Sequence, residues 1–233
     1  MANESMITKD YIVAFIDILG ATRMIEEDQN KSLEIVHNAY DSAWKIYKEI
    51  FKKKTRFDFK FFSDNVVIAI QVKKEENIRS YFSYMSVMAS LIQLNFLMRD
   101  ILVRGGIALG GYYSDDLMIW GKGLIKAYEL ENTIAIYPRI VVDPELIGKM
   151  ELFTDEKIDL SDYGLIQDID GICYLDFFQK KIIQNRPDFL LKEMEDMDKR
   201  LEGTKKLKIL QKHNWHQNYI ISKLKDLYLD EYS

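Results

Sequence analysis

The sequence contains little cysteine, proline or glycine, and each shortage excludes a class of protein. Its 233 residues include a single cysteine, Cys173, so no disulfide can form within the chain, and such cysteine usage is typical of a reducing compartment. With only 3 prolines and 11 glycines, the chain does not have the composition of a disordered protein or a long linker. We therefore expect a folded, cytoplasmic protein.

Basic charge in excess and long apolar runs are also missing. The formal net charge is -5 with both signs interspersed, so no basic surface for a nucleic acid or an anionic membrane is predicted. The apolar runs are far shorter than a membrane span, and the N-terminus lacks the basic and apolar segments of a secretory signal. We expect neither a nucleic acid nor a membrane among the partners of this protein.

The spacing of the apolar residues, which make up 48% of the chain, predicts an α+β fold. Strands are predicted at residues 11–16, 57–62, 66–72, 102–109, 117–120, 139–142, 165–169 and 172–174. Helices are predicted at residues 33–51, 78–101, 124–131 and 187–229. This order is that of the ferredoxin-like βαββαβ arrangement, with a largely antiparallel sheet and helices on one face. Residues 8–180 are expected to form the main domain, and residues 185–233 a C-terminal helical extension packed on it.

Two aspartates lie where predicted strands end. Asp17 follows the first apolar run, and Asp64 lies in the polar turn of the predicted hairpin. If the hairpin lies beside the first strand, both carboxylates converge and offer the oxygen ligands that Mg²⁺ and Mn²⁺ prefer. Two such ions, about 3.5–4 Å apart, can stabilise the attacking and leaving oxygens of an in-line displacement. The alternative is that Asp17 caps the next helix and Asp64 is an ordinary turn residue. The spacing alone leaves both interpretations open.

Four short motifs resemble those of class III nucleotidyl cyclases, in the family's order, over about residues 10–145. They are Phe15-Ile16-Asp17-Ile18-Leu19-Gly20, Ser63-Asp64, Arg104-Gly-Gly-Ile-Ala-Leu-Gly110, and Ile119-Trp120-Gly121 followed by Leu130-Glu131. The resemblance implies that residues 8–180 are a cyclase catalytic domain. It implies that Asp17 and Asp64 bind two Mn²⁺ or Mg²⁺ ions, with the Ile18 backbone carbonyl as a further ligand. It also implies a homodimer with composite active sites at the interface.

The same resemblance gives a role to the segment after Asp17. Backbone amides at a helix start can bind the phosphates of a nucleotide, and a glycine allows close approach of the main chain. The residues expected to bind the substrate in this way are Leu19, Gly20, Ala21 and Thr22. A simple turn at Gly20 is the alternative.

The predicted helix at 124–131 departs from the family pattern. Ile125 stands where many members have an asparagine that stabilises the transition state, and Glu129 stands where they have a phosphate-binding arginine. The chain is therefore either a degenerate cyclase-like module or an enzyme in which other cations have taken over. The candidate cations are Arg104, Lys122, Lys126 and Arg139, with Arg104 and Arg139 assigned to catalysis and Lys126 to substrate binding. For each of them, an ordinary surface cation is the alternative.

The expected base pocket departs from the family pattern as well. Lys60 occupies the position of an adenine-reading lysine, but Met118 stands where its aspartate partner would be. Strand alternation places Arg56 and Lys60 on the Asp64 side of the sheet, where they can meet a pyrimidine edge. These features resemble the bacterial pyrimidine cyclases of Pycsar antiphage defence. The resemblance implies UTP, or CTP, as substrate and a separately encoded effector protein that responds to the cyclic product. Adenylate or guanylate cyclase activity is the alternative.

Overall fold

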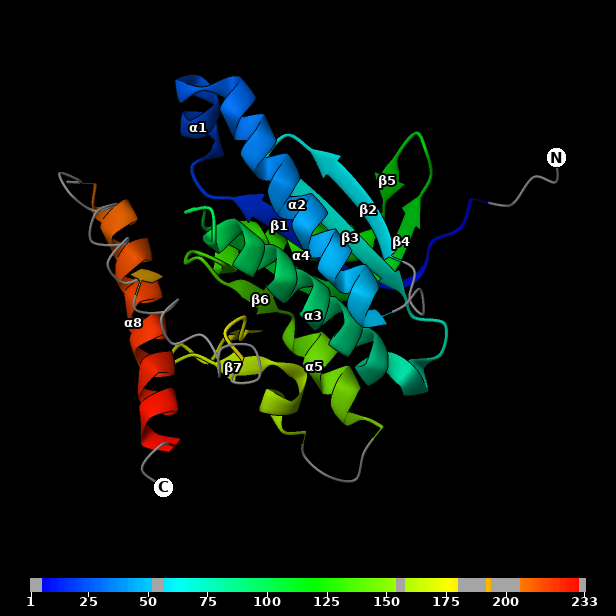
Figure 1. The fold of residues 1–233 in the computed structure, drawn as a ribbon. Helices are drawn as coiled ribbons and strands as arrows, with labels where there is room; N and C mark the ends of the chain where they lie inside the picture. Colours follow the sequence, from blue (N-terminus) through cyan, green and yellow to red (C-terminus); the bar gives the residue numbers. More distant parts are fainter. Residues whose placement is uncertain (1–5, 52–56, 154–157, 180–191, 194–205, 231–233) are drawn as a thin grey trace.

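The computed structural model describes residues 6–51, 57–153, 158–179, 192–193 and 206–230. Its centre is an eight-stranded sheet in which seven strands follow the order β2-β3-β1-β4-β6-β8-β7, while β5 pairs with β4 (Figure 1). The strands are β1 (Lys9–Ile18), β2 (Phe57–Phe62), β3 (Asn65–Gln71), β4 (Val103–Ser114), β5 (Ile119–Trp120), β6 (Ile140–Val142), β7 (Leu165–Gln167) and β8 (Cys173–Leu175). The pair β4 and β6 is parallel, and the other pairs are antiparallel. The first four strands therefore have the spatial order of the predicted βαββαβ arrangement.

Helices cover both faces of the sheet, so the prediction that they lie on one face alone is wrong. They are α1 (Ala21–Glu27), α2 (Gln29–Phe51), α3 (Ile78–Leu97), α4 (Lys122–Glu129), α5 (Pro144–Glu151) and α8 (Leu207–Asp230). Ile12, Ala14 and Ile16 of β1 face the layer of α2 and α3. The alternate residues Val13 and Phe15 share a smaller core with Ala127 of α4. Because successive side chains of a strand point to opposite faces, α4 must lie across the sheet from α2 and α3.

The helix α5 was not predicted, although its start signal is in the sequence. Asp143 follows the last residue of β6 and directly precedes Pro144. In the structure the Asp143 carboxylate accepts a hydrogen bond from the Glu145 amide at 3.0 Å, and Pro144 occupies the first turn. An aspartate cap followed by proline is a helix start, and it outweighed the strand pattern here.

The C-terminal helix α8 packs against the edge of the sheet formed by the later strands. Its buried residues Tyr219, Ile220 and Leu224 share a core with residues near β8 and with the C-terminal end of α3, namely Tyr174, Phe177, Phe178, Leu94 and Leu97. The expected boundary between domains, at residues 180–185, lies outside the described residues. Among the residues that the structure describes, no helix combines the length and apolar character that a membrane crossing needs.

Candidate active site

The two predicted aspartates lie side by side in adjacent elements. Asp17 is the next-to-last residue of β1 and pairs with Asn65 of β3. Asp64 lies in the two-residue turn between β2 and β3, and its backbone carbonyl accepts a hydrogen bond from the Ile18 amide at 3.1 Å. The helix that follows Asp17 begins at Gly20, which makes no side-chain cap bond, so Asp17 is not a helix cap. Asp64 is a turn residue, as the alternative proposed, but it is also the neighbour of Asp17.

Arg104 of β4 joins Asp17 to a third carboxylate. Asp17 and Arg104 stand directly opposite each other in the β1–β4 register, and Arg104 Nε lies 3.1 Å from Asp17 Oδ2. On its other side, Arg104 Nη2 lies 2.6 Å from Oε1 of Glu131. Glu131 belongs to η2 (Leu130–Ile134), a π-helical turn that continues α4, and only 3% of the residue is exposed. The resemblance singled out Arg104 and Asp17, but it gave Glu131 no role.

These charges act on one another because the cluster is shielded from water. Burial raises the pKa of Asp17, the Arg104 guanidinium acts in the opposite direction, and the nearby Asp64 carboxylate raises it further. Burial likewise raises the pKa of Glu131, and Arg104 opposes this effect. Ionisation of Asp17 in the folded chain therefore costs free energy, and a further cation bound nearby would lower that cost.

The donor set at Asp17 and Asp64 fits a hard divalent cation. Two carboxylates and the Ile18 backbone provide only oxygen donors, which Mg²⁺ and Mn²⁺ prefer over nitrogen or sulfur. Within the described ranges, no group of three or more His, Cys, Asp or Glu residues is arranged to hold a metal ion. The described residues thus form no complete protein cage. This suits Mg²⁺, which usually takes one or two carboxylates and completes its shell with water and substrate phosphates.

The segment expected to bind phosphate is only partly available. The Leu19 amide donates to the Leu102 carbonyl at 2.9 Å, so it already has a partner, and its contact with phosphate stays a prediction. Gly20 has a φ of 82° and turns the chain into α1. The first bond of that helix runs from the Met24 amide to the Gly20 carbonyl, which leaves the amides of Ala21 and Thr22 without a partner inside the helix. Ala21 also lines a pocket of ≈ 230 Å³ together with Ile18 and Asp64.

The residues predicted to read the base lie near one another at the β4–β5 turn. Lys60 Nζ donates to the Asp115 carbonyl at 2.7 Å, and the Asp115 amide donates to the Met118 carbonyl at 3.1 Å. The Asp115 carboxylate accepts hydrogen bonds from the amides of Leu117 and Met118 and from the Tyr113 hydroxyl. Asp115 therefore holds Lys60 and Met118 close together at the β4–β5 turn, a role that the sequence did not indicate. Arg56 lies outside the described residues.

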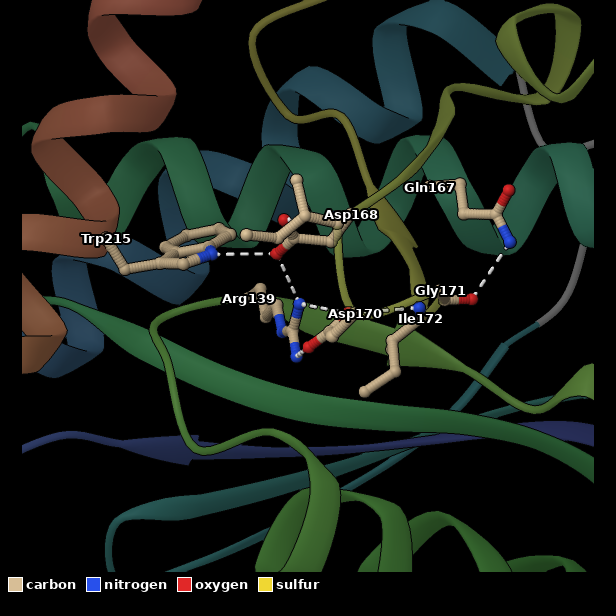
Figure 2. A network of polar contacts seen from close by, with 8 residues as sticks. Arg139, Gln167, Asp168, Asp170, Gly171, Ile172 and Trp215 are labelled. Atoms are coloured by element: carbon tan, nitrogen blue, oxygen red, sulfur yellow. Dashed lines mark hydrogen bonds and ion pairs between the residues drawn. The ribbon is translucent and has the colours of Figure 1, made fainter.

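Two other predicted cations are engaged away from Asp17. Lys126 of α4 pairs with Glu145 and lies 3.8 Å from Asp143 of the α5 cap. Arg139, which precedes β6, is 1% exposed and pairs with Asp168 at 2.5 Å and Asp170 at 2.6 Å. The Asp168 carboxylate also accepts a hydrogen bond from Trp215 of α8 (Figure 2). The structure thus gives Arg139 two carboxylate partners in a separate network, and we do not include it in the site proposed below.

Solved structures with a similar fold include several cyclases. The adenylyl cyclase CyaB from P. aeruginosa is similar over 72% of this chain and 93% of its own, with a TM-score of 0.45 and 17% identity. The adenylate/guanylate cyclase/hydrolase from Silicibacter pomeroyi is similar over 72% and 97%, with a TM-score of 0.47 and 17% identity. The guanylyl cyclase domain of the RhoGC fusion protein from Blastocladiella emersonii is similar over 72% and 94%, with a TM-score of 0.45 and 14% identity. No protein-family model and no curated protein sequence matches the chain.

Proposed function

We propose that this protein is a nucleotidyl cyclase, which converts a nucleoside triphosphate to its 3′,5′-cyclic monophosphate and pyrophosphate. The observation that carries the proposal is the meeting of Asp17, Asp64 and Arg104, from three separate motifs, at one end of the sheet. An isolated turn aspartate and a capping aspartate would have no reason to meet there beside a half-buried arginine.

In the proposed reaction, the ribose 3′ oxygen forms a bond to the α phosphorus. The bond from that phosphorus to the oxygen of the pyrophosphate breaks, and the hydroxyl proton passes to solvent. Asp17 and Asp64 would hold the divalent ions, which supply charge stabilisation to the attacking and leaving oxygens when bound. The free amides of Ala21 and Thr22 would orient the phosphates. Arg104 would keep the Asp17 carboxylate in its position through their direct ion pair.

We further propose that the substrate is a pyrimidine triphosphate, UTP ahead of CTP, and that its cyclic product signals to a separate effector in antiphage defence. Lys60 supplies donors for pyrimidine carbonyls. The side chain of Met118, at the same β4–β5 turn, cannot accept a hydrogen bond from the adenine amine. One observation favours adenylate cyclase as a second candidate. Lys60 donates to the backbone carbonyl of Asp115, and its charge acts on the Asp115 carboxyl, so a lysine and an aspartate lie near each other as a pair that reads adenine would require.

Incubation with Mn²⁺ and each of the four triphosphates should distinguish these candidates. We expect a cyclic pyrimidine product well ahead of the purine products, identified by mass spectrometry. Lys60→Ala should lower pyrimidine turnover about tenfold or more, because an unmade hydrogen bond to a base costs about 1.4 kcal/mol or more. Lys73→Ala, at an exposed lysine just after β3, serves as the matched control. Preference for ATP would support the second candidate, and absence of any cyclic product would indicate a degenerate module.

The homodimer is proposed from exposed apolar side chains of β2, α4 and β5. Phe62 and Tyr128 both contact the ring of Phe15, yet Phe62 is 45% exposed and Tyr128 47% exposed. Ile125 of α4 and Trp120 of β5 add 54% and 64% exposed side chains. Neighbouring exposed apolar residues of this size are typical of an interface, and a second copy of the chain would cover them by two-fold symmetry.

If each site takes its metal ligands from one subunit and its base reader from the other, two defective variants should complement each other. An equal mixture of Asp64→Asn and Lys60→Glu chains should regain about a quarter of wild-type activity, because half of the dimers are mixed and each has one intact site. The chains would be unfolded and refolded together, with each parent refolded alone as the control. Recovery no greater than the sum of the parents would contradict a composite site.

A further inference from the structure

The C-terminal helix brings a lysine to the acidic cluster. Lys212 of α8 is half-buried, and burial lowers its pKa. The charges that act on it most strongly are those of Arg104, Asp17 and Glu131, so the side chain lies within the electrostatic reach of the cluster. Conversely, Lys212 acts on the carboxyls of both Asp17 and Glu131. A residue almost 200 positions after Asp17 in the sequence thus belongs to its surroundings.

The position of Lys212 is fixed by the docking of α8. Trp215, one helical turn later and on the same side of the helix, donates its indole N–H to Asp168 at 2.8 Å (Figure 2). Its ring stacks on Tyr137 with centroids 5.8 Å apart, and Arg139 lies between these aromatic rings and the two aspartates. The Arg139 carbonyl accepts a hydrogen bond from the amide of Gly105, the residue after Arg104. The docking network is therefore directly joined to the strand that carries Arg104.

Lys212 differs from the candidate cations Arg104, Lys126 and Arg139 in having no direct partner. Among the residues that the structure describes, it forms neither an ion pair nor a hydrogen bond, whereas Arg104, Lys126 and Arg139 are all paired with carboxylates. A lysine that loses hydration without gaining a partner raises the free energy of the fold, and an anion bound to its ammonium group would offset this cost. Arg104 pairs with the carboxylates of Asp17 and Glu131, and Asp64 adds a third negative charge that acts on Asp17. Lys212 offsets part of this negative charge, which would repel an anionic substrate.

We propose that Lys212 is a substrate-binding residue that contacts the polyphosphate of the triphosphate, and that α8 supplies it to the site of its own chain. This rests on the proposed function. It would provide the phosphate-binding cation that is missing from α4, where Glu129 stands in place of an arginine. A lysine suits this role because its ammonium group can approach any of several phosphate oxygens.

Binding of inorganic tripolyphosphate with Mn²⁺, measured by calorimetry, tests the proposal without any base or turnover. Lys212→Met retains the aliphatic stem and removes the charge, and it should bind this probe about tenfold more weakly than the wild type. Lys212→Arg should stay within about threefold of the wild type. Lys225→Ala, an exposed lysine further along α8, is the control and should bind like the wild type. Mn²⁺ alone should bind to Lys212→Met at least as tightly as to the wild type, because a neighbouring positive charge is removed.

Unchanged or tighter binding of tripolyphosphate by folded Lys212→Met would overturn the assignment, as would an equal loss in Lys225→Ala. Circular dichroism and thermal unfolding of each variant show whether the fold is retained. If Lys212→Met fails to fold, the Lys212→Arg and Lys212→Gln pair decides, with loss expected only in the glutamine variant. Failure of the wild type to bind the probe would overturn the proposed function together with this inference. Wild-type binding that is insensitive to Lys212 would overturn this inference alone.

Discussion

Asp64→Asn should abolish cyclic nucleotide formation, with a fall in turnover of about 10³-fold or more. The change removes a charged oxygen ligand while retaining the shape of the side chain, and the stabilisation that a bound divalent ion supplies is worth several kcal/mol. Asp17→Asn should have the same effect. Calorimetric titration with Mn²⁺ should show weaker binding in both variants, so the loss of activity can be traced to the metal site.

Whereas Asp64→Asn should lower the activity, it should not lower the thermal stability of the metal-free protein. The Asp64 carboxylate raises the pKa of Asp17, which means that the two negative charges repel each other in the folded chain. Removing one of them should leave the melting temperature unchanged or raise it when no metal is present. Asp162→Asn, at an exposed aspartate in the turn Leu160–Tyr163, is the control and should alter neither property. Full activity in folded Asp64→Asn would show that the site does not use this carboxylate.

Arg139→Gln should destabilise the fold by about 3 kcal/mol. Arg139 is 1% exposed and bridges Asp168 and Asp170, so its loss leaves carboxylates without their cation. Breaking a buried pair from one side costs about 3–5 kcal/mol, and the lower value is expected because the Asp170 side chain is 39% exposed. Denaturant unfolding measures the change. Arg23→Gln removes an arginine whose side chain is 82% exposed, and it should stay within about 0.5 kcal/mol of the wild type.

The same arginine should give the fold a dependence on acidic pH. Burial tends to raise the pKa of Asp170, but the hydrogen bond and charge of Arg139, together with backbone hydrogen bonds that include the Ile172 amide, outweigh it, so the pKa lies below its ordinary value of 3.8. A carboxyl with a lowered folded-state pKa stabilises the fold above its unfolded pKa, and this contribution is lost as the pH falls through the folded value. Arg139→Gln should therefore lose less stability than the wild type when the pH is lowered below about 4. An equal acid sensitivity in both chains would contradict this role.

The strands and the first helices could be predicted because their signals are local. The predicted strand 57–62 coincides with β2, and the apolar run at 11–16 lies inside β1. The hairpin turn at Asp64 follows from polar residues between two apolar runs. The neighbouring positions of Asp17 and Asp64 depended on the strand order, which the βαββαβ pattern already implies.

What the sequence did not reveal depends on contacts between distant segments. Glu131 resembled any acidic residue near the end of a helix, and only the packing of α4 against β4 buries it beside Arg104. Lys212 lies in a helix of many lysines, and apolar spacing cannot tell which of them faces the sheet. The start of a predicted strand at Arg139 favours a catalytic cation there, whereas in the structure its partners Asp168 and Asp170 lie in the turn between β7 and β8.

The π-helical turn at Leu130–Ile134 sets the rotational phase of the residues that follow α4. Its hydrogen bond runs from the Ala135 amide back five residues to the Leu130 carbonyl, at 2.8 Å. Such a turn holds one residue more than an α-helical turn, and it arises when a single residue is inserted into a regular helix. Each α-helical residue advances the side-chain direction by about 100°. A relative with one residue fewer in this turn would therefore point a different side chain at Arg104. In related chains, the length of this turn indicates which acidic residue can pair with that arginine as Glu131 does here.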